Sequence, residues 1–306
     1  MTYQWFYFDL ISKDDLMIVV IFHGRPYFLS FDISILDICI YQGGLKKQYG
    51  YTQPVGESVF EKSPVRVSVS QSHLIKYDDH YIINIDEKDI QMQLELKPSF
   101  DHWKPFGIPL YKSEKYYFNW QIYSPYLHVT GYFSTDGKKT SVEGRGYLDY
   151  NEGNYLFNKF LKSWIWGRFY SSVDVFIFGS LCFKNNEIYQ PAIYVDLQNS
   201  RIFELAKSVK FDGLKIEIPA SDFRDGFQIE KFDRIDSVKL LMSKIPESMR
   251  FFRKVHEYSF DRLNRTKFGR KITPAFVNIN YDRFKTTSCL DNTSSYQGIL
   301  ETMKFL

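Results

Sequence analysis

The 306-residue sequence has few of the features that mark disulfide-stabilised, zinc-binding or membrane-spanning proteins. Its three cysteines, Cys39, Cys182 and Cys289, are far apart and form no CxxC pair, so neither a disulfide framework nor a zinc knuckle is expected. No apolar run approaches the ~20 residues that a transmembrane helix requires. Acidic residues precede the short apolar stretch at residues 16–22, where a secretory signal would carry positive charge. These absences predict a soluble, cytoplasmic protein without an integral membrane segment.

The sequence also lacks the motifs of several enzyme classes. Its six histidines show no HxH or HExxH spacing, so we expect no metal site. There is no GxSxG elbow or P-loop, and the Gly-Arg-Gly at residues 144–146 lacks the third glycine of a dinucleotide-binding turn. The net charge is only +3, with 39 basic and 36 acidic residues interspersed, which gives no electrostatic reason to expect nucleic acid. We therefore expect neither a cofactor nor a nucleic-acid partner.

Aromatic residues, in contrast, are abundant. The 28 Phe, 23 Tyr and 5 Trp make up 18% of the chain, and such side chains suit pleated sheets and line apolar cavities. Apolar and polar residues alternate at residues 65–69, 90–97, 173–177 and 193–197. Turn sequences at residues 77–80, 136–137 and 184–186 separate these segments at hairpin spacing. The pattern predicts an all-β protein of antiparallel strands, with one short helix at about residues 154–163 that begins at Asn154 as N-cap.

The length favours two domains, because a single domain usually has roughly 100–150 residues. A barrel of about eight short strands is wide enough to hold one small ligand. Two such units fit 306 residues. We therefore expect two antiparallel β-barrel or sandwich domains packed together, at residues 1–160 and 161–306, that join near residues 155–170.

Two short segments concentrate aromatic and polar residues. The first is Trp-Phe-Tyr-Phe-Asp at residues 5–9. The second is GRGYLDYNEGN at residues 144–154, which is followed by Trp-Ile-Trp-Gly-Arg at residues 164–168. This second region places glycines, carboxylates, aromatics and arginine at the expected domain junction.

These segments resemble those of a two-domain lipocalin-like family that includes carotenoid hydratase (hydroxyneurosporene synthase), the AttH-type proteins and certain fungal Diels-Alderases. Residues 5–9 are similar to a WWYFD-like run, residues 146–153 to a GYHDHNWG-like run, residues 164–168 to a WxWGR run, and residues 296–301 to a Tyr-x-Gly-x-Leu-Glu ending. The resemblance spans nearly the whole chain and implies two lipocalin-like domains around a hydrophobic small molecule. Where the family has His-Asp-His-Asn-Trp, this chain has Leu-Asp-Tyr-Asn-Glu at residues 148–152, so carotenoid hydration does not carry over.

The central segment supplies the candidate catalytic residues Asp149, Tyr150, Asn151 and Glu152. Burial among aromatic side chains keeps a carboxyl group protonated, and Asp149 would then protonate an alkene, with Glu152 as a partner carboxylate. Aromatic faces would stabilise the carbocation, which water capture, proton loss or internal attack would convert by hydration, isomerisation or cyclisation. A pericyclic cyclisation needs only a shaped pocket and a hydrogen bond to an activating carbonyl, for which Tyr150, Asn151 and Arg168 are suited.

Aromatic and basic residues near these motifs are the candidate substrate contacts. They are Trp5, Tyr7, Trp120, Tyr126, His128, Trp164, Trp166 and Arg168. Structural interpretations stand beside this one. The tryptophans suit a core, and Arg168 suits a partner for Asp149 or Asp9. Glu152 would pair with Arg145 or Arg168, and the glycine-rich segment would be a tight turn that its own Asp and Asn side chains cap.

The leading hypothesis is a cofactor-independent enzyme that acts on a hydrophobic polyene or isoprenoid molecule. Asp149 would be the proton donor or a polar anchor in a cavity between the two domains. The alternative is a non-catalytic carrier that binds and shields a lipid-like ligand, as many lipocalin barrels do.

Overall fold

The computed structural model describes residues 2–12, 14–25, 32–99, 106–114, 116–154, 160–199, 201–204, 210–211, 216–217, 231–239, 279–290 and 294–305. These residues fall into two compact units. Unit 1 holds the described residues up to 154, and unit 2 holds those from 160 onward. The predicted division at residue 160 and the predicted cavity between the domains stay predictions.

Unit 1 is one antiparallel sheet in the order β4-β3-β2-β1-β12-β11-β9-β8-β7-β6-β5, with β10 paired to β11. Its strands are β1 (Tyr3–Ser12), β2 (Met17–Gly24), β3 (Ile33–Gln42), β4 (Leu45–Pro54), β5 (Val59–Lys62), β6 (Val65–Val69), β7 (Ser72–Lys76), β8 (Tyr81–Glu87), β9 (Ile90–Pro98), β10 (Phe106–Lys112), β11 (Tyr117–Thr135) and β12 (Lys138–Gly153), and a single 3-10 turn, η1 (Val55–Glu57), joins β4 to β5. Hairpins connect most neighbours, as the alternating pattern and the turn sequences predict.

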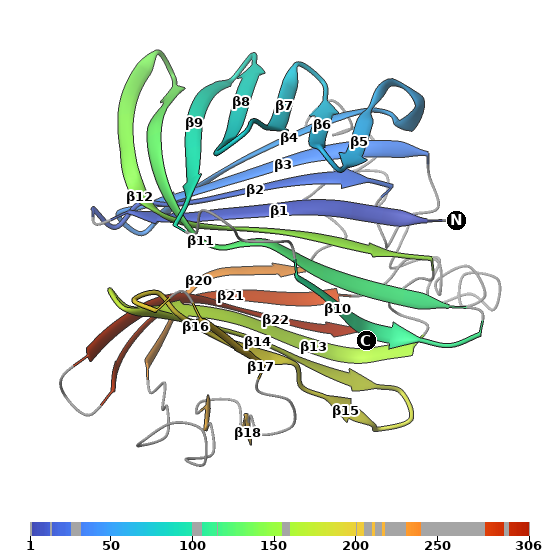
Figure 1. Cartoon of the computed structure of the whole chain (residues 1–306). Helices are drawn as coiled ribbons and strands as arrows, with labels where there is room; N and C mark the ends of the chain where they lie inside the picture. Colours follow the sequence, from blue (N-terminus) through green and yellow to red (C-terminus); the bar gives the residue numbers. More distant parts are fainter. Residues whose placement is uncertain are drawn as a thin grey trace. The chain divides into compact units, whose positions relative to one another are not determined.

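The sheet of unit 1 curls so that β5–β9 arch over β1–β4 (Figure 1). Its concave face carries a continuous apolar core drawn from nine strands, which includes Phe6, Phe8, Val20, Val67 and Leu148. Burial of such side chains is the main source of stability of a sheet of this kind. At the edge strand β4, the Lys47 ammonium donates to the Asp136 carboxylate at 2.7 Å, which ties this edge to the turn between β11 and β12.

The hairpin of β11 and β12 is the longest in unit 1, and two irregularities interrupt its register between Ile122 and Leu127. Before these irregularities, residues 117–122 of β11 pair with β10. After them, residues 127–135 pair with β9. Such β-bulges bend a strand and change the direction of its side chains. The interruption lies opposite residues 147 and 148, immediately before the polar part of the central motif.

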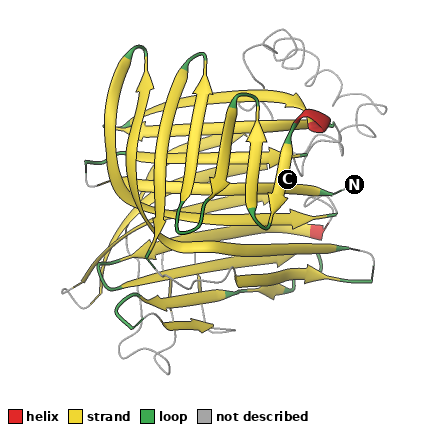
Figure 2. Cartoon of the chain, turned by 45° about the horizontal axis from the view of Figure 1, so that its top comes forward, coloured by secondary structure: helices red, strands yellow, loops and turns green. Residues whose placement is uncertain are grey.

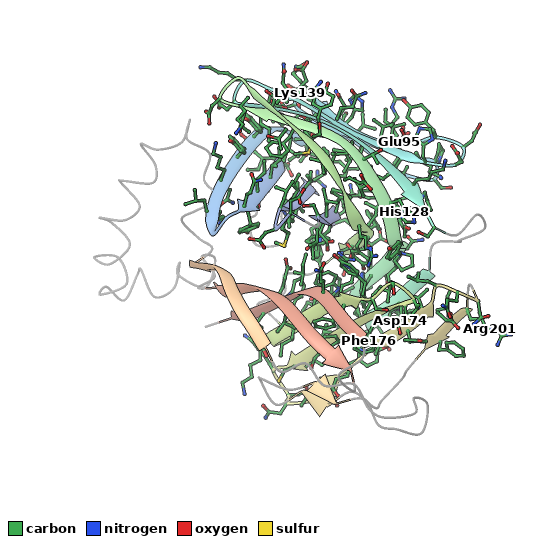
Figure 3. All side chains as sticks on the ribbon, turned by 90° about the vertical axis from the view of Figure 1, so that its left-hand side faces the viewer. Glu95, His128, Lys139, Asp174, Phe176 and Arg201 are labelled. Atoms are coloured by element: carbon green, nitrogen blue, oxygen red, sulfur yellow. The ribbon has the colours of Figure 1, made fainter. Side chains whose placement is uncertain are left out.

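Unit 2 contains a second antiparallel sheet in the order β17-β16-β14-β13-β22-β21-β20, with β15 paired to β14, and a small β18–β19 pair. Its strands are β13 (Leu161–Tyr170), β14 (Asp174–Phe183), β15 (Ile188–Tyr189), β16 (Ala192–Asp196), β17 (Arg201–Glu204), β18 (Lys210–Phe211), β19 (Ile216–Glu217), β20 (Lys231–Lys239), β21 (Ile279–Leu290) and β22 (Ser294–Phe305). One face of this sheet packs the stacked rings of Phe169, Phe176 (labelled in Figure 3) and Phe178.

The predicted all-β class is confirmed, and strands dominate the described part of both units (Figure 2). The predicted helix at residues 154–163 is wrong at residues 161–163, which belong to β13, whereas Phe160 is helical. The side-chain oxygen of Asn154, the predicted N-cap, accepts a hydrogen bond from the Tyr117 backbone N–H at 2.9 Å. Residues 155–159 lie outside the described residues. Among the helices of the described chain, none has the length and hydropathy needed to cross a bilayer.

A glycine substitution tests the tight contact between β9 and β11. A Cβ atom on Gly131, where φ is +150°, would lie 2.0 Å from the Gln93 carbonyl oxygen. Gly131→Ala is therefore expected to lower the free energy of unfolding by about 2–4 kcal/mol, measured by urea denaturation. The control is Gly50→Ala in β4, where a Cβ meets no atom within 4 Å, and a change of about 0.5 kcal/mol or less is expected. Equal stability of the two variants would contradict the packing described for Gly131.

Candidate functional site

The four motif segments pair with one another as neighbouring strands. In unit 1, residues 5–9 of β1 run antiparallel to the central motif of β12, with Trp5 opposite Asn151 and Tyr7 opposite Asp149. In unit 2, residues 164–168 of β13 run antiparallel to the ending of β22, with Trp166 opposite Glu301. Each unit therefore contains one pair of motifs that are distant in sequence and adjacent in the sheet.

Asp149 is buried, with 4% of its surface exposed, and several side chains donate hydrogen bonds to it. Its Oδ2 atom accepts from the Trp120 indole N–H and from the Tyr147 hydroxyl, both at 2.8 Å. Its Oδ1 atom accepts from the Asn151 amide at 2.9 Å. The Trp120 indole also lies 3.1 Å from the Tyr147 hydroxyl. We call Trp120, Tyr147, Asp149 and Asn151 the Asp149 cluster.

Aromatic rings from β1 lie beside this cluster on the same face of the sheet. Tyr7 packs edge-on against Tyr147 with ring centroids 6.3 Å apart. Trp5 stacks on Tyr3 and on Phe118 at 5.9 and 6.1 Å. All of these side chains are buried, and Trp5, Tyr7 and Asn151 retain 6–7% exposure. The three predicted contacts Trp5, Tyr7 and Trp120 therefore lie together with Asp149.

The donors around Asp149 favour its ionised form. A carboxylate that accepts several hydrogen bonds is stabilised in its charged state, which opposes the effect of burial. Tyr147 remains a neutral donor, because burial and then the charge of Asp149 raise the pKa of its phenol well above the ordinary value. Of the two roles expected for Asp149, this geometry suits the polar anchor better than the proton donor.

Tyr150 and Glu152 lie on the opposite face of β12 from Asp149, because alternate residues of a strand point to opposite sides. The Tyr150 hydroxyl is 2.9 Å from the Gln4 side-chain oxygen and 2.9 Å from Glu152 Oε2. Glu152 Oε2 also accepts from the Lys62 ammonium at 3.0 Å. The four predicted catalytic residues therefore divide into two separate pairs.

The remaining predicted contacts of unit 1 lie further along the hairpin. Tyr126 is buried, and its ring meets the exposed His128 edge-on at 5.3 Å (His128 is labelled in Figure 3). In the register, His128 faces Arg145, four residues before Asp149. The Arg145 guanidinium lies 5.7 Å from the Tyr126 ring centroid. The structure thus groups these residues with Arg145 and not with the Asp149 cluster.

Three predicted contacts belong to β13 of unit 2. Trp164, Trp166 and Arg168 share one face of that strand. The two tryptophans are partly exposed, whereas Arg168 is fully buried and its guanidinium lies 4.9 Å from the Tyr170 ring centroid. Their contact with a substrate, and a pairing of Arg168 with Asp149 or Asp9, stay predictions.

Two structural alternatives are now decided. The glycine-rich segment is not a tight turn, since residues 146–153 are part of β12. Its glycines serve close packing instead: a Cβ on Gly153 would lie 2.1 Å from the Tyr3 hydroxyl. Glu152 was expected to pair with Arg145 or Arg168. This is wrong, because the ion pair that Glu152 makes is with Lys62.

Sequence reasoning missed Tyr147 and Lys62. Tyr147 precedes Asp149 by two residues, so strand alternation would have placed both on one face if the segment had been interpreted as a strand. No local signal points to Lys62, which is 90 residues from Glu152 in sequence. Among the described residues, no group of three or more His, Cys, Asp or Glu is arranged to hold a metal ion. The expectation that the site uses no cofactor stays a prediction.

Buried phenols give a prediction for alkaline pH. Burial raises the pKa of Tyr123 to about 12, and it raises that of Tyr147 well above the ordinary value. Since tyrosines of the unfolded chain titrate near about 10, these groups stabilise the fold fully below that pH and lose their contribution as the pH rises toward the folded values. We expect the urea midpoint to fall above about pH 10, and to fall less steeply in Tyr147→Phe. Titration of all 23 tyrosines near pH 10 without unfolding would contradict this account.

Comparison with solved structures identifies the fold. An AttH-type protein from Nitrosomonas europaea superposes with a TM-score of 0.57 at 12% identity, over 98% of this chain and 91% of that one. CghA, solved with Sch210972, gives 0.58 at 9% identity over 100% and 88%, and kievitone hydratase from Nectria haematococca gives 0.53 at 10% over 99% and 88%. No family model and no curated protein matches the sequence. The chain therefore shares the fold of the AttH-type protein, CghA and kievitone hydratase, with 98–100% of the chain covered, as the motif resemblance predicts.

Proposed function

We propose that the protein is a cofactor-independent enzyme that acts on C=C bonds of a hydrophobic polyene or isoprenoid molecule, by hydration, isomerisation or cyclisation. The observation that carries this proposal is the Asp149 carboxylate, held by three donors beside buried aromatic rings. Kievitone hydratase and CghA, which share the fold, support the reaction class by analogy.

Asn151 is the residue best suited to contact an oxygen atom of the substrate. One N–H of its amide donates to Asp149, which fixes the orientation of the amide plane. The amide has a second N–H and an oxygen, and the residue keeps 7% exposure. A hydrogen bond from this N–H to an activating carbonyl would stabilise charge that develops in a cyclisation.

Trp5 and Tyr7 are suited to the apolar part of the substrate. Both flank the Asp149 cluster from β1, and both keep a small exposed area. Their rings offer flat apolar surfaces that orient a conjugated chain and stabilise positive charge. In this arrangement Asp149 acts as the anchor that positions Asn151. Of the three reactions, this role fits a cyclisation, which needs no proton from Asp149.

A carrier without catalysis is the second candidate. It is favoured by the mutual hydrogen bonds of Trp120, Tyr147 and Asp149, which satisfy these groups without a ligand. Mass spectrometry of the ligand extracted from the natively purified protein, before and after incubation, separates the two functions. A carrier returns its ligand unchanged, whereas an enzyme returns a product.

The role of Asp149 is tested with Asp149→Asn on the extracted substrate. This change removes the charge and one acceptor, so we expect turnover to fall by about 10²-fold with the fold retained. The control is Asp86→Asn, the same chemical change at an exposed position of β8, which should leave turnover unchanged. Equal turnover of wild type and Asp149→Asn would remove Asp149 from the mechanism.

Incubation of the wild type in D₂O distinguishes the two roles of Asp149. A cyclisation guided by a polar anchor introduces no solvent deuterium at carbon, whereas protonation of an alkene does. We expect a product without carbon-bound deuterium, read by mass spectrometry. Deuterium at carbon would contradict the anchor role and restore the proton-donor hypothesis.

A further inference from the structure

A second polar group lies on the concave face of unit 1, opposite the Asp149 cluster. It consists of Gln4 from β1, Lys62 from β5 and Tyr150 and Glu152 from β12, and we call it the inner clamp. In the register, Gln4 of β1 and Asn119 of β11 lie directly across from Glu152. The next row of paired residues across these strands holds Trp5, Asn151 and Trp120. The two groups therefore occupy adjacent rows on opposite faces of the same three strands.

Residues 149–152 of β12 make one side-chain hydrogen bond on each face of the sheet. On one face Asn151 donates to Asp149, and on the other Tyr150 donates to Glu152, both between residues two positions apart. The distance between such side chains depends on the pleat and twist of the backbone that joins them. Because residues 149–152 share one backbone segment, a change in either hydrogen bond alters the geometry available to the other.

β11 and β1, the two strands beside β12, each place two consecutive residues on opposite faces, one in each polar group. β11 contributes Trp120 to the Asp149 cluster, and the preceding Asn119 amide lies 3.5 Å from Glu152 Oε1. β1 contributes Trp5 on one face and Gln4 on the other. Displacement of Glu152 would thus act on all three strands that carry the proposed site.

Lys62 fixes Glu152 from the opposite wall of the curled sheet. Its ammonium is 3.0 Å from Glu152 Oε2 and 5.4 Å from the Tyr150 ring centroid, and its backbone carbonyl accepts from the Tyr123 hydroxyl at 2.9 Å. The side chains of Lys62 and Glu152 are 47% and 20% exposed, so solvent screens this ion pair and it adds little to stability.

We propose that Lys62, Tyr150 and Glu152 are positioning residues, which act through the β12 backbone on Asp149 and Asn151. The inference rests on the proposed function for its consequence, since Asp149 and Asn151 are the residues assigned to substrate. It also changes the role of Tyr150 and Glu152, which the sequence predicts as catalytic. The inner clamp sets the geometry of the site and does not contact the substrate.

The test is the chemical shift of the Trp120 indole N–H, which donates to Asp149. With ¹⁵N-labelled tryptophan the protein gives five indole signals, and Trp120→Phe identifies the relevant one. We expect this signal to move in Lys62→Met and in Glu152→Gln, and to keep its wild-type position in Lys62→Arg, which retains the positive charge.

The matched control is Lys47→Met, which removes a similar ion pair, that of Lys47 with Asp136, at the edge strand β4. It should leave the Trp120 signal in place. An unmoved Trp120 signal in folded Lys62→Met and Glu152→Gln would overturn the proposal, as would an equal movement in Lys47→Met. Movement in Lys62→Arg as large as in Lys62→Met would overturn the role of the charge.

Binding of cis-parinaric acid, a fluorescent conjugated polyene, gives a second readout. Its dissociation constant should rise by up to about fivefold in Lys62→Met and stay unchanged in Lys47→Met. The indole shift is measured without any ligand. If the wild type fails to bind the polyene, polyene recognition by this site is contradicted, and the indole shift alone decides the positioning role.

Discussion

The central constraint in this protein is the burial of the Asp149 carboxylate. A charged group removed from water is costly unless hydrogen-bond donors surround it. The chain meets this requirement with Trp120 from β11 and with Tyr147 and Asn151 from β12 itself. These contacts require that residues 118–122 of β11 pair with residues 149–153 of β12 in one register, before the irregular stretch between Ile122 and Leu127 begins. They also explain why aromatic residues of β1 can pack against a polar segment, since its carboxyl oxygens already accept hydrogen bonds.

The strand pattern of this fold could be predicted from sequence because it is local. Alternation at residues 65–69 and 90–97 and the turn at residues 136–137 are signals within a few positions, and each predicts the observed element. The short aromatic motifs likewise point to the residues of unit 1 that surround Asp149. The expectation for residues 154–163 failed at residues 161–163, because pairing with β14 and β22 overrides the weak helical preference there.

The site itself could be predicted only in part. Asp149, Asn151, Trp5, Tyr7 and Trp120 were chosen from sequence and lie together. Tyr150 and Glu152 were grouped with them because they are their neighbours in sequence. In a strand the same neighbours face opposite sides, so the division into two groups follows from the secondary structure and not from the residue types. Lys62 depends on tertiary pairing and leaves no trace in the local sequence.

The fold is shared at 9–12% identity with an AttH-type protein, CghA and kievitone hydratase. At that distance the scaffold is common, and the chemistry depends on the side chains of each site. In this chain Leu148 and Tyr150 stand where the similar motif has histidines, and both lie on the opposite face of β12 from Asp149 and Asn151. An aspartate with donors to both carboxyl oxygens is suited to hold an amide in place for a substrate oxygen.

The most direct test of this account is the ionisation state of Asp149, read from its side-chain carboxyl carbon by NMR. Labelling with [4-¹³C]aspartate and comparison with Asp149→Asn would assign the resonance. The account predicts a carboxylate resonance at neutral pH, because Trp120, Tyr147 and Asn151 all donate to this group. A resonance at the position of a protonated carboxylic acid would contradict it.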